Sequence, residues 1–240
     1  MSVWFASDLH LDTATPVTAE RFLRFLAGPL RGARALYLLG DVFETWIGDD
    51  DPEPAHVAVA AALRAVAERD TLIYLMRGNR DFLIGERFCA ATGALLLEDP
   101  AIVTVAGTRV LLSHGDGLCV ADSAYQRLRA LVRDPGVRRS FLALPLADRR
   151  RLAAEARAGS RAHVANAGEY IADVSQAAVE TLLLAAGVQV MIHGHTHRPA
   201  IHPFSLGGVP CTRIVLGDWQ STASVLRWDQ AGYRLQPCPA

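Results

Sequence analysis

Five short apolar runs in this chain of 240 residues each end directly at a small block of polar residues, and this arrangement limits the folds that the chain can adopt. The runs are VWFA, ALYLL, LIYLM, RVLLS and VQVMI. The blocks that follow them are SDLH at 7–10, GDVFE at 40–44, GNRD at 78–81, HGD at 114–116 and GHTH at 194–197. Short apolar runs bounded by glycine and polar residues are typical of buried strands. We therefore expect all five blocks to converge on one edge of a sheet.

The blocks contain the oxygen and imidazole ligands that two divalent ions about 3.5 Å apart would need. These candidate metal ligands are Asp8, His10, Asp41, Asn79, His114, His195 and His197. Asp8 and His10 lie two residues apart at a strand end, so both side chains can point to the same side and reach one ion. The same spacing relates His195 and His197. Asp41 is alone in its block and is the candidate to bridge the two ions.

The type of ligand also limits the metal. Carboxylate, imidazole and amide ligands without thiolates favour Mn²⁺, and they are compatible with Mg²⁺, Zn²⁺ or Fe²⁺. The four cysteines are far apart and form no CxxC pair, which predicts neither a zinc knuckle nor a disulfide framework: they are Cys89, Cys119, Cys211 and Cys238. Glycines beside the ligands predict tight backbone turns at positions 40, 78, 115 and 194.

Length and composition predict one domain, residues 1–240, with a modest insertion, because a chain with 51% hydrophobic residues can bury a full core. The N-terminus lacks a basic leader and runs directly into the first polar block, which predicts a cytoplasmic protein. Charged residues or glycine interrupt every apolar stretch before the roughly 20 residues that a membrane-spanning helix needs. We expect no crossing of a membrane.

Apolar strands alternate with helical patterns in the first half of the chain. Helices are predicted near 17–27, 55–69 and 82–91, and the residues on either side of Gly107 predict a β-hairpin. The C-terminal segments CTRIVLGDW, SVLRW and GYRLQ return to short strands. Strands in both halves with helices outside them predict an α/β fold, a four-layer αββα sandwich of two mixed sheets flanked by helices.

The alternation stops between Asp122 and about Ala186, where the pattern is almost wholly helical. Breaks are predicted at 134–136, at Pro145 and at Gly159. Because this block separates HGD from GHTH, we expect a helical lid insertion over the site, at about 122–170.

The charge is unevenly distributed, although the net charge is only −1. The segment from Arg127 to Arg161 contains ten arginines and three acidic residues, a net charge of +7. The rest of the chain contains fourteen arginines and twenty-two acidic residues, a net charge of −8. An arginine-rich segment can bind nucleic acid. The acidic remainder, and the lack of aromatic residues alternating with these arginines, exclude nucleic acid as the expected partner.

The ordered blocks D-x-H, G-D, G-N-R-D, H-G-D and G-H-T-H resemble the signature of the calcineurin-like metallophosphoesterase superfamily, over residues 8 to 197. The resemblance implies a first metal held by Asp8, His10, Asp41 and His197. It implies a second metal held by Asp41, Asn79, His114 and His195. A hydroxide that bridges the two ions would be the nucleophile and would attack phosphorus in line with the leaving oxygen. The catalytic residues would be Asp41, Asn79, Arg80 and His114.

Arg80 stands where many members of this superfamily have histidine after the GN pair. Arginine cannot donate a proton at neutral pH, but it can hold phosphate oxygens with a bidentate fork. A leaving group that is already good needs no acid. Arg80 therefore favours cleavage of a pyrophosphate over hydrolysis of an alkyl ester.

Longer strings around the blocks resemble one branch of the superfamily over nearly the whole chain. They are GDVFETWIGDDDP, GNRDFLIGERF, HGDGLCVADSAYQ, FLALPL and IHGHTHRPAIH. The branch is the UDP-2,3-diacylglucosamine pyrophosphatase family of the lipid A pathway. Membership implies attack of water on the α-phosphorus, yielding 2,3-diacylglucosamine 1-phosphate (lipid X) and UMP, with Mn²⁺ as the usual metal. It also implies a peripheral protein on the cytoplasmic face of the bacterial inner membrane, and we expect a monomer.

The same resemblance implies the residues that bind substrate. Asp122 and Ser160 match positions that contact the glucosamine unit. Asn79 and Arg80 match positions that contact the phosphates, and His195 would touch the substrate as well as its metal.

The chain departs from the family pattern after Ser160. The family has a polar Asn or Thr and then Lys where this chain has Val164 and Ala167, and the chain contains no lysine at all. Arg157 and Arg161 are the candidates to replace the missing positive charge.

The predicted lid is rich in apolar residues, and two interpretations stay open. The residues are Leu128, Leu131, Val132, Phe141, Leu142, Leu144 and Leu146. They would line a cleft for two acyl chains under a basic lid, or they would only pack the lid on the body. The alternative activity is hydrolysis of soluble nucleotide sugars or other nucleotide pyrophosphates. A binding module without catalysis is disfavoured, because all seven candidate ligands are present.

Overall fold

The computed structural model describes residues 2–166, 173–221 and 223–239, with the backbone alone for 161–166. Its first sheet has six strands in the order β11-β10-β1-β2-β3-β4. The four strands β1 to β4 run parallel, whereas β10 and β11 are antiparallel to their neighbours, so the sheet is mixed. The strands are β1 (Val3–Ala6), β2 (Ala35–Leu39), β3 (Leu72–Met76), β4 (Ala94–Leu97), β10 (Ser224–Asp229) and β11 (Gly232–Pro237).

The second sheet has five strands in the order β5-β6-β7-β9-β8 and is also mixed. Its first two strands form the antiparallel hairpin predicted around Gly107. The strands β4 and β8 were not predicted from the sequence. The strands of this sheet are β5 (Ala101–Val105), β6 (Thr108–Ser113), β7 (Val190–His193), β8 (Ala200–Leu206) and β9 (Val209–Val215).

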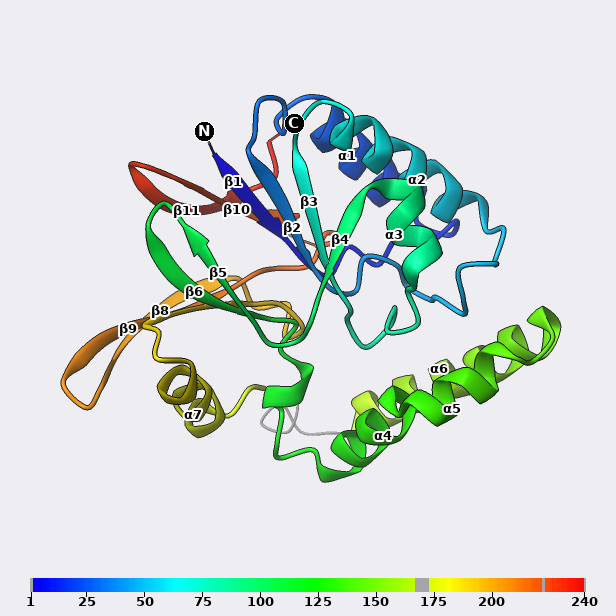
Figure 1. Cartoon of the computed structure of the whole chain (residues 1–240). Helices are drawn as coiled ribbons and strands as arrows, with labels where there is room; N and C mark the ends of the chain where they lie inside the picture. Colours follow the sequence, from blue (N-terminus) through cyan, green and yellow to red (C-terminus); the bar gives the residue numbers. More distant parts are fainter. Residues whose placement is uncertain (1, 167–172, 222, 240) are drawn as a thin grey trace.

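The two sheets pack face to face, with helices on both outer faces (Figure 1). Alternate side chains of one strand point to opposite faces. On β1, Trp4 packs against Phe25 of α1, while Phe5 joins the core between the two sheets. On the far side, Val179 and Leu183 of α7 pack against the second sheet. The predicted four-layer αββα sandwich is confirmed, and its helices are α1 (Pro16–Ala27), α2 (Pro54–Ala67), α3 (Glu86–Thr92) and α7 (Gln176–Ala186).

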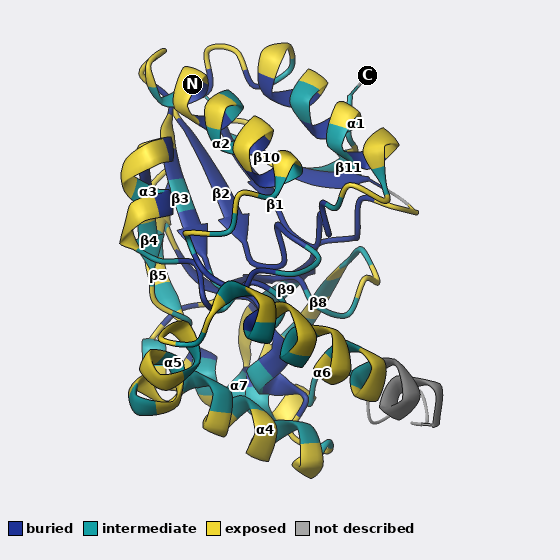
Figure 2. Cartoon of the chain, turned by 90° about the vertical axis from the view of Figure 1, so that its right-hand side faces the viewer, coloured by how far each residue is buried: buried dark blue, intermediate teal, exposed yellow. Residues whose placement is uncertain are grey.

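Three further helices project from one edge of this sandwich (Figure 1). They are α4 (Ser123–Arg133), α5 (Pro135–Leu142) and α6 (Leu146–Asn166), and we call them the helical insertion. The predicted break at 134–136 is confirmed: the Asp134 carboxylate caps α5, accepting hydrogen bonds from the N–H groups of Gly136 at 2.8 Å and Val137 at 3.0 Å. None of the residues of α4 and α5 is buried, as Figure 2 shows.

Two details of the predicted helices are wrong. Helix α3 begins at Glu86 rather than near Phe82, because the carboxylate of Asp49 accepts hydrogen bonds from Gly85 N at 2.9 Å and Phe88 N at 3.0 Å. Helix α6 continues through Gly159, since an interior glycine costs a helix only about 1 kcal/mol. Helix α7, which follows the predicted insertion at 122–170, packs on the second sheet as part of the sandwich. Among the described residues, no helix combines the length and apolar character needed to span a membrane.

Candidate metal centre

The structure brings all seven predicted ligands together where β1, β2, β3, β6 and β7 end. Potential ligand atoms of Asp8, His10 and His197 lie within 4.8 Å of one another, as do those of Asp8, Asp41 and His114. The remaining two join through the amide oxygen of Asn79. This Oδ1 lies 2.9 Å from His114 Nε2 and 2.9 Å from His195 Nδ1.

Asp41 lies between the two halves of this cluster. Its Oδ1 is 3.7 Å from Nε2 of His114, and its Oδ2 is 3.8 Å from Nε2 of His10. The carboxylate thus turns one oxygen toward each half. A carboxylate that bridges two ions would need this orientation.

The buried donor atoms fit a divalent cation. Asp8 Oδ1 is buried and makes no hydrogen bond to any described residue, although His197 Nε2 lies 3.3 Å away. The Nε2 atoms of His10 and His197 approach each other to 3.2 Å. Buried polar groups without hydrogen bonds are costly, and carboxylate oxygens and neutral imidazole nitrogens are ligands for divalent ions. A shared cation would satisfy them together.

The titration of the histidines supports this fit. Burial by itself lowers the pKa of His114, but the carboxylates of Asp41, Asp8 and Asp116 raise it to about 9. The cluster therefore favours positive charge at its centre. Burial and the charge of His114 lower the pKa of His195 to about 4. His195 is consequently neutral at pH 7, the form in which imidazole binds metals.

Five of the seven ligands have a backbone conformation that is rare for residues other than glycine. Their φ angles are +55° at Asp8, +50° at His10, +52° at Asp41, +68° at His195 and +56° at His197. Such left-handed conformations cost of order 1–3 kcal/mol each and persist where the surroundings over-determine them. Hydrogen bonds between the ligand loops supply this constraint, including Asp8 N to Gly40 O at 3.1 Å and His195 N to Asp8 Oδ2 at 2.9 Å.

The glycines beside the ligands have two different roles. Gly40 has a φ of +90°, as predicted for a tight turn, and a Cβ atom there would also lie 2.6 Å from Nδ1 of His114. Gly78 is required by close approach, because a Cβ atom would collide with the carboxylate of Asp41. Both glycines let two ligand loops pack against each other.

Hydrogen bonds from outside the ligand set orient two of the imidazoles. His10 Nδ1 lies 2.8 Å from Oε2 of Glu44, and His114 Nδ1 lies 2.9 Å from the carbonyl oxygen of Leu39. Each contact holds a proton on Nδ1 and turns Nε2 toward the cluster. Glu44 was not predicted, although its place in the GDVFE block was a signal.

Asp81 was also missed, and it ties two ligand loops together. Its buried carboxylate accepts backbone hydrogen bonds from Gly78 at 2.7 Å, Val42 at 2.8 Å and Asp41 at 3.2 Å. Its position in GNRD was the available signal. Asp81 therefore fixes the blocks GDVFE and GNRD relative to each other.

Asp116, in the HGD block, anchors the helical insertion and was likewise missed. Its buried carboxylate accepts hydrogen bonds from Tyr125 Oη at 2.7 Å, Arg129 Nε at 2.9 Å and a terminal nitrogen of Arg133 at 3.0 Å. The ring of Tyr125 is nearly parallel to that of His195, with centroids 6.3 Å apart. The first helix of the insertion is thus attached beside the cluster.

A second anchor lies on α6. The buried Arg149 donates hydrogen bonds to Ile47 O and Asp50 Oδ1, both at 2.7 Å. Arg157, a predicted lid charge, pairs with the carboxylate of Glu44 and donates to its backbone carbonyl. Since Glu44 also contacts His10, α6 touches a loop that carries a predicted ligand.

The predicted substrate residues have the following surroundings. Arg80 donates its backbone N–H to Asp41 Oδ1 at 2.8 Å, and its buried Nε has no hydrogen bond within the described structure. Asp122 caps α4 through Tyr125 N at 2.9 Å. Ser160 lies on α6. Three predicted positions lie outside the residues whose side chains are described: Arg161, Val164 and Ala167.

The chain is similar to known phosphoesterases over most of its length. Residues 1–199 match the family model of the calcineurin-like phosphoesterases. A protein of Xanthomonas oryzae pv. oryzae named UDP-2,3-diacylglucosamine hydrolase is 50% identical, with 98% of each chain covered, and one of Marinobacter nauticus with the same name is 52% identical over 91% of this chain and 90% of its own. The solved structure of an archaeal phosphodiesterase shares the fold, at a TM-score of 0.50 and 13% identity over 99% of both chains.

Proposed function

The chain belongs to the calcineurin-like phosphoesterase family, and from this premise we propose that it hydrolyses the pyrophosphate bond of UDP-2,3-diacylglucosamine. The products are UMP and 2,3-diacylglucosamine 1-phosphate, an intermediate of lipid A biosynthesis. The observation that carries the proposal is the similarity to hydrolases of that name, because it extends over the helical insertion as well as the ligand blocks.

The seven clustered residues would hold two divalent ions, which we propose to be Mn²⁺. Asp8, His10 and His197 would serve one ion, Asn79, His114 and His195 the other, and Asp41 both. When bound, two such ions supply a water of lowered pKa and stabilise charge on phosphate oxygens. The buried, hydrogen-bonded loops described above would hold their ligands in place without rearrangement.

Arg80 and Asn79 would position the pyrophosphate. The Nε of Arg80 has no hydrogen-bond partner among the described residues, so its guanidinium can donate to phosphate oxygens. Water attacks the α-phosphorus, the P–O–P bridge breaks, and the bridging oxygen leaves with the sugar phosphate. That phosphate leaves as a stable anion and needs no proton from an acid. The reaction therefore does not require a proton donor at Arg80, which cannot act as an acid at neutral pH.

The helical insertion would receive the acylated glucosamine. Leu128 and Leu131 of α4 are 51% and 57% exposed, so these two side chains are not buried between the insertion and the sandwich. Exposed leucines beside arginines suit a lipid with an anionic head. We extend the proposal to peripheral binding at the cytoplasmic face of the inner membrane, with Asp122 and Ser160 contacting the sugar.

The test is release of UMP from UDP-2,3-diacylglucosamine by purified protein in H₂¹⁸O with Mn²⁺. The proposal predicts turnover that chelation abolishes and ¹⁸O in the UMP. Label in the sugar phosphate would contradict attack at the α-phosphorus. Turnover of UDP-N-acetylglucosamine at an equal rate would instead indicate a pyrophosphatase for soluble nucleotide sugars.

A further inference from the structure

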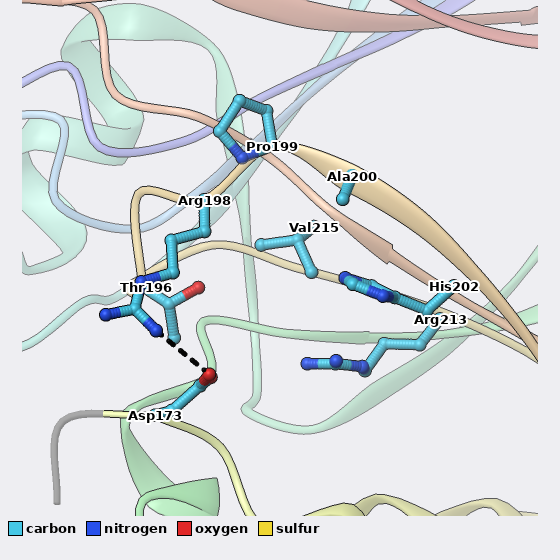
Figure 3. Close-up of a pocket in the computed structure, with 8 residues that line it drawn as sticks. All are labelled: Asp173, Thr196, Arg198, Pro199, Ala200, His202, Arg213 and Val215. Carbon is cyan, nitrogen blue, oxygen red and sulfur yellow. Dashed lines mark hydrogen bonds and ion pairs between the residues drawn. The ribbon is translucent and has the colours of Figure 1, made fainter. Parts of the chain in front are cut away.

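A cavity of about 240 Å³ lies beside the candidate metal centre, at the start of β8 and the end of β9 (Figure 3). Its lining residues are Asp173, Thr196, Arg198, Pro199, Ala200, His202, Arg213 and Val215. None of them belongs to the predicted ligands or substrate residues. Pockets for drug-sized ligands typically measure about 300–1,000 Å³. This cavity therefore suits a small polar group rather than a pair of acyl chains.

The cavity is continuous with the ligand loop. Thr196 stands between the predicted ligands His195 and His197, and Arg198 follows directly. On the other wall, Arg213 of β9 pairs in register with His202 of β8. The loop that carries two of the predicted ligands therefore also forms one wall of the cavity.

The walls of the cavity come from β8, β9, the loop 196–199 and Asp173, and they include no residue of α4, α5 or α6. A substrate with its pyrophosphate at the centre has two halves, a nucleoside and an acylated sugar. If the insertion receives the sugar, the nucleoside needs a different place, and this cavity adjoins the ligand loop.

The cavity offers several hydrogen-bond donors and one carboxylate. Figure 3 shows the side chains of Arg198, Arg213 and His202 around the hollow, with Asp173 at its base. Asp173 pairs with Arg198 at 3.2 Å. The Nε of Arg213 is buried without a hydrogen bond in the described structure, and its terminal nitrogen lies only at the limit of hydrogen bonding, 3.5 Å, from Nε2 of His193. Buried donors of this kind are normally satisfied, which points to a ligand with acceptor atoms.

Uracil has the complementary chemistry. The edge of the base presents two carbonyl acceptors on either side of one N–H donor, and the ribose adds two hydroxyl groups. Guanidinium groups donate to the carbonyls, while a carboxylate accepts from N–H or hydroxyl groups. We propose that this cavity binds the uridine of the nucleotide substrate, with Arg213 and Arg198 as donors and Asp173 as acceptor. This inference rests on the proposed function, because it assigns a place to the half of the substrate that the insertion does not take.

The test measures binding of the product UMP rather than turnover. Calorimetric titration of the Mn²⁺-loaded protein compares UMP with ribose 5-phosphate, which has the sugar and phosphate but no base. Arg213→Ala is expected to lower the affinity for UMP about tenfold, which corresponds to about 1.4 kcal/mol. Its affinity for ribose 5-phosphate should stay within about twofold of wild type, since one lost donor to a carbonyl leaves the phosphate contacts intact.

Two variants accompany this measurement. Arg234→Ala removes an exposed arginine from β11 of the other sheet and should leave both affinities unchanged. Arg198→Ala repeats the test at a half-exposed side chain, so that misfolding of the first variant does not decide the result. If both cavity variants lose affinity for UMP and for ribose 5-phosphate equally, the cavity binds only the phosphate. If their affinity for UMP is unchanged, the cavity has no role in binding the nucleotide. Either result overturns the proposal.

Turnover separates this proposal from the proposed function. If wild type releases UMP from UDP-2,3-diacylglucosamine but the cavity variants bind UMP normally, only the uridine site is overturned. If wild type does not hydrolyse that lipid, yet UMP binding depends on Arg213, the lipid substrate is wrong and the uridine site stands.

Discussion

The candidate metal centre and the helical insertion differ in how they are held. The centre lies on loops that follow five strands, with Asp8, His10, Asp41 and His114 buried and five ligands in left-handed backbone conformations. The insertion has no buried residue in α4 or α5; ion pairs attach it to the sandwich at Asp116, at Asp50 and at Glu44, and the partly buried Phe141 packs against the core. A rigid centre suits one chemistry, whereas a more exposed segment can vary with the substrate. We therefore propose that the centre determines the reaction and the insertion determines the lipid.

Charge distribution reinforces this contrast. The centre concentrates carboxylates, which raise the pKa of His114, so it favours cations. Among the described arginines of the insertion, Arg127, Arg139, Arg150 and Arg151 are exposed, and the others are partly or fully buried. Two of these arginines, Arg129 and Arg133, turn inward to Asp116 instead. The two regions are thus joined by ion pairs between their opposite charges.

The largest effect is expected from Asp41→Asn in the centre. Loss of the carboxylate between the two halves should lower kcat/KM by more than about 10³-fold, about 4 kcal/mol of transition-state stabilisation. Steady-state release of UMP measures this loss. The exposed Glu68→Gln on the surface is the matched control, and a residual activity above one tenth would contradict a bridging role.

Acid is expected to weaken the sandwich through His56. Burial between Phe43 and Trp46 lowers its pKa from 6.5 to about 4. The folded state therefore keeps His56 neutral, and the stability present above pH 6.5 is lost as the pH falls toward 4, by up to about 3 kcal/mol. In urea unfolding of metal-free protein, the free energy of unfolding of His56→Leu should rise relative to that of wild type as the pH falls from 7 to 4.5. A constant difference across this range would remove His56 as a cause.

Glu44→Gln tests the contact that links the two regions. The amide cannot hold a proton on His10 Nδ1 as a carboxylate does, so Mn²⁺ affinity should fall about 10- to 30-fold. Arg157→Ala leaves Glu44 in place, so it should lower the affinity for Mn²⁺ by less than Glu44→Gln does. Competition with a fluorescent chelator measures both affinities. If Glu44→Gln binds Mn²⁺ as wild type does, the contact with His10 has no orienting role.

A smaller effect is expected when the insertion is released from Asp116. In the double variant Arg129→Ala/Arg133→Ala, KM for the lipid substrate should rise about tenfold, about 1.4 kcal/mol. Hydrolysis of bis(p-nitrophenyl) phosphate should stay within about threefold, because the centre is intact. Arg127→Ala, on the exposed side of α4, is the control. An equal loss on both substrates would place these arginines in the chemistry instead of the insertion.

The regular parts of the molecule were predictable because local pattern determines them. Continuous apolar runs bounded by glycine and polar residues predicted most strands, and the breaks at 134–136 and Pro145 follow from local backbone chemistry. The start of α3 was not predictable, because its cap comes from Asp49, 37 residues before Glu86. Strand β8 was missed because its alternating side chains are only half buried.

The metal centre was also predictable only in part. Its ligands follow from residue type and spacing, whereas Glu44, Asp81 and Asp116 act through partners far away in the chain. Asp81 bonds the backbone of Val42, and Asp116 bonds a helix that begins after it. Spacing alone cannot assign such roles, because they depend on which loops the fold brings together.

We propose that the centre provides the chemistry and the insertion selects the acylated substrate. This division is tested by the ratio of kcat/KM for UDP-2,3-diacylglucosamine to that for UDP-N-acetylglucosamine, in wild type and in Leu128→Ser/Leu131→Ser. We expect a wild-type ratio above about 10², and a ratio at least about tenfold lower in the variant with UDP-N-acetylglucosamine turnover unchanged. A wild-type ratio near one, or a ratio that the variant leaves unchanged, would show that the insertion does not select the acylated substrate.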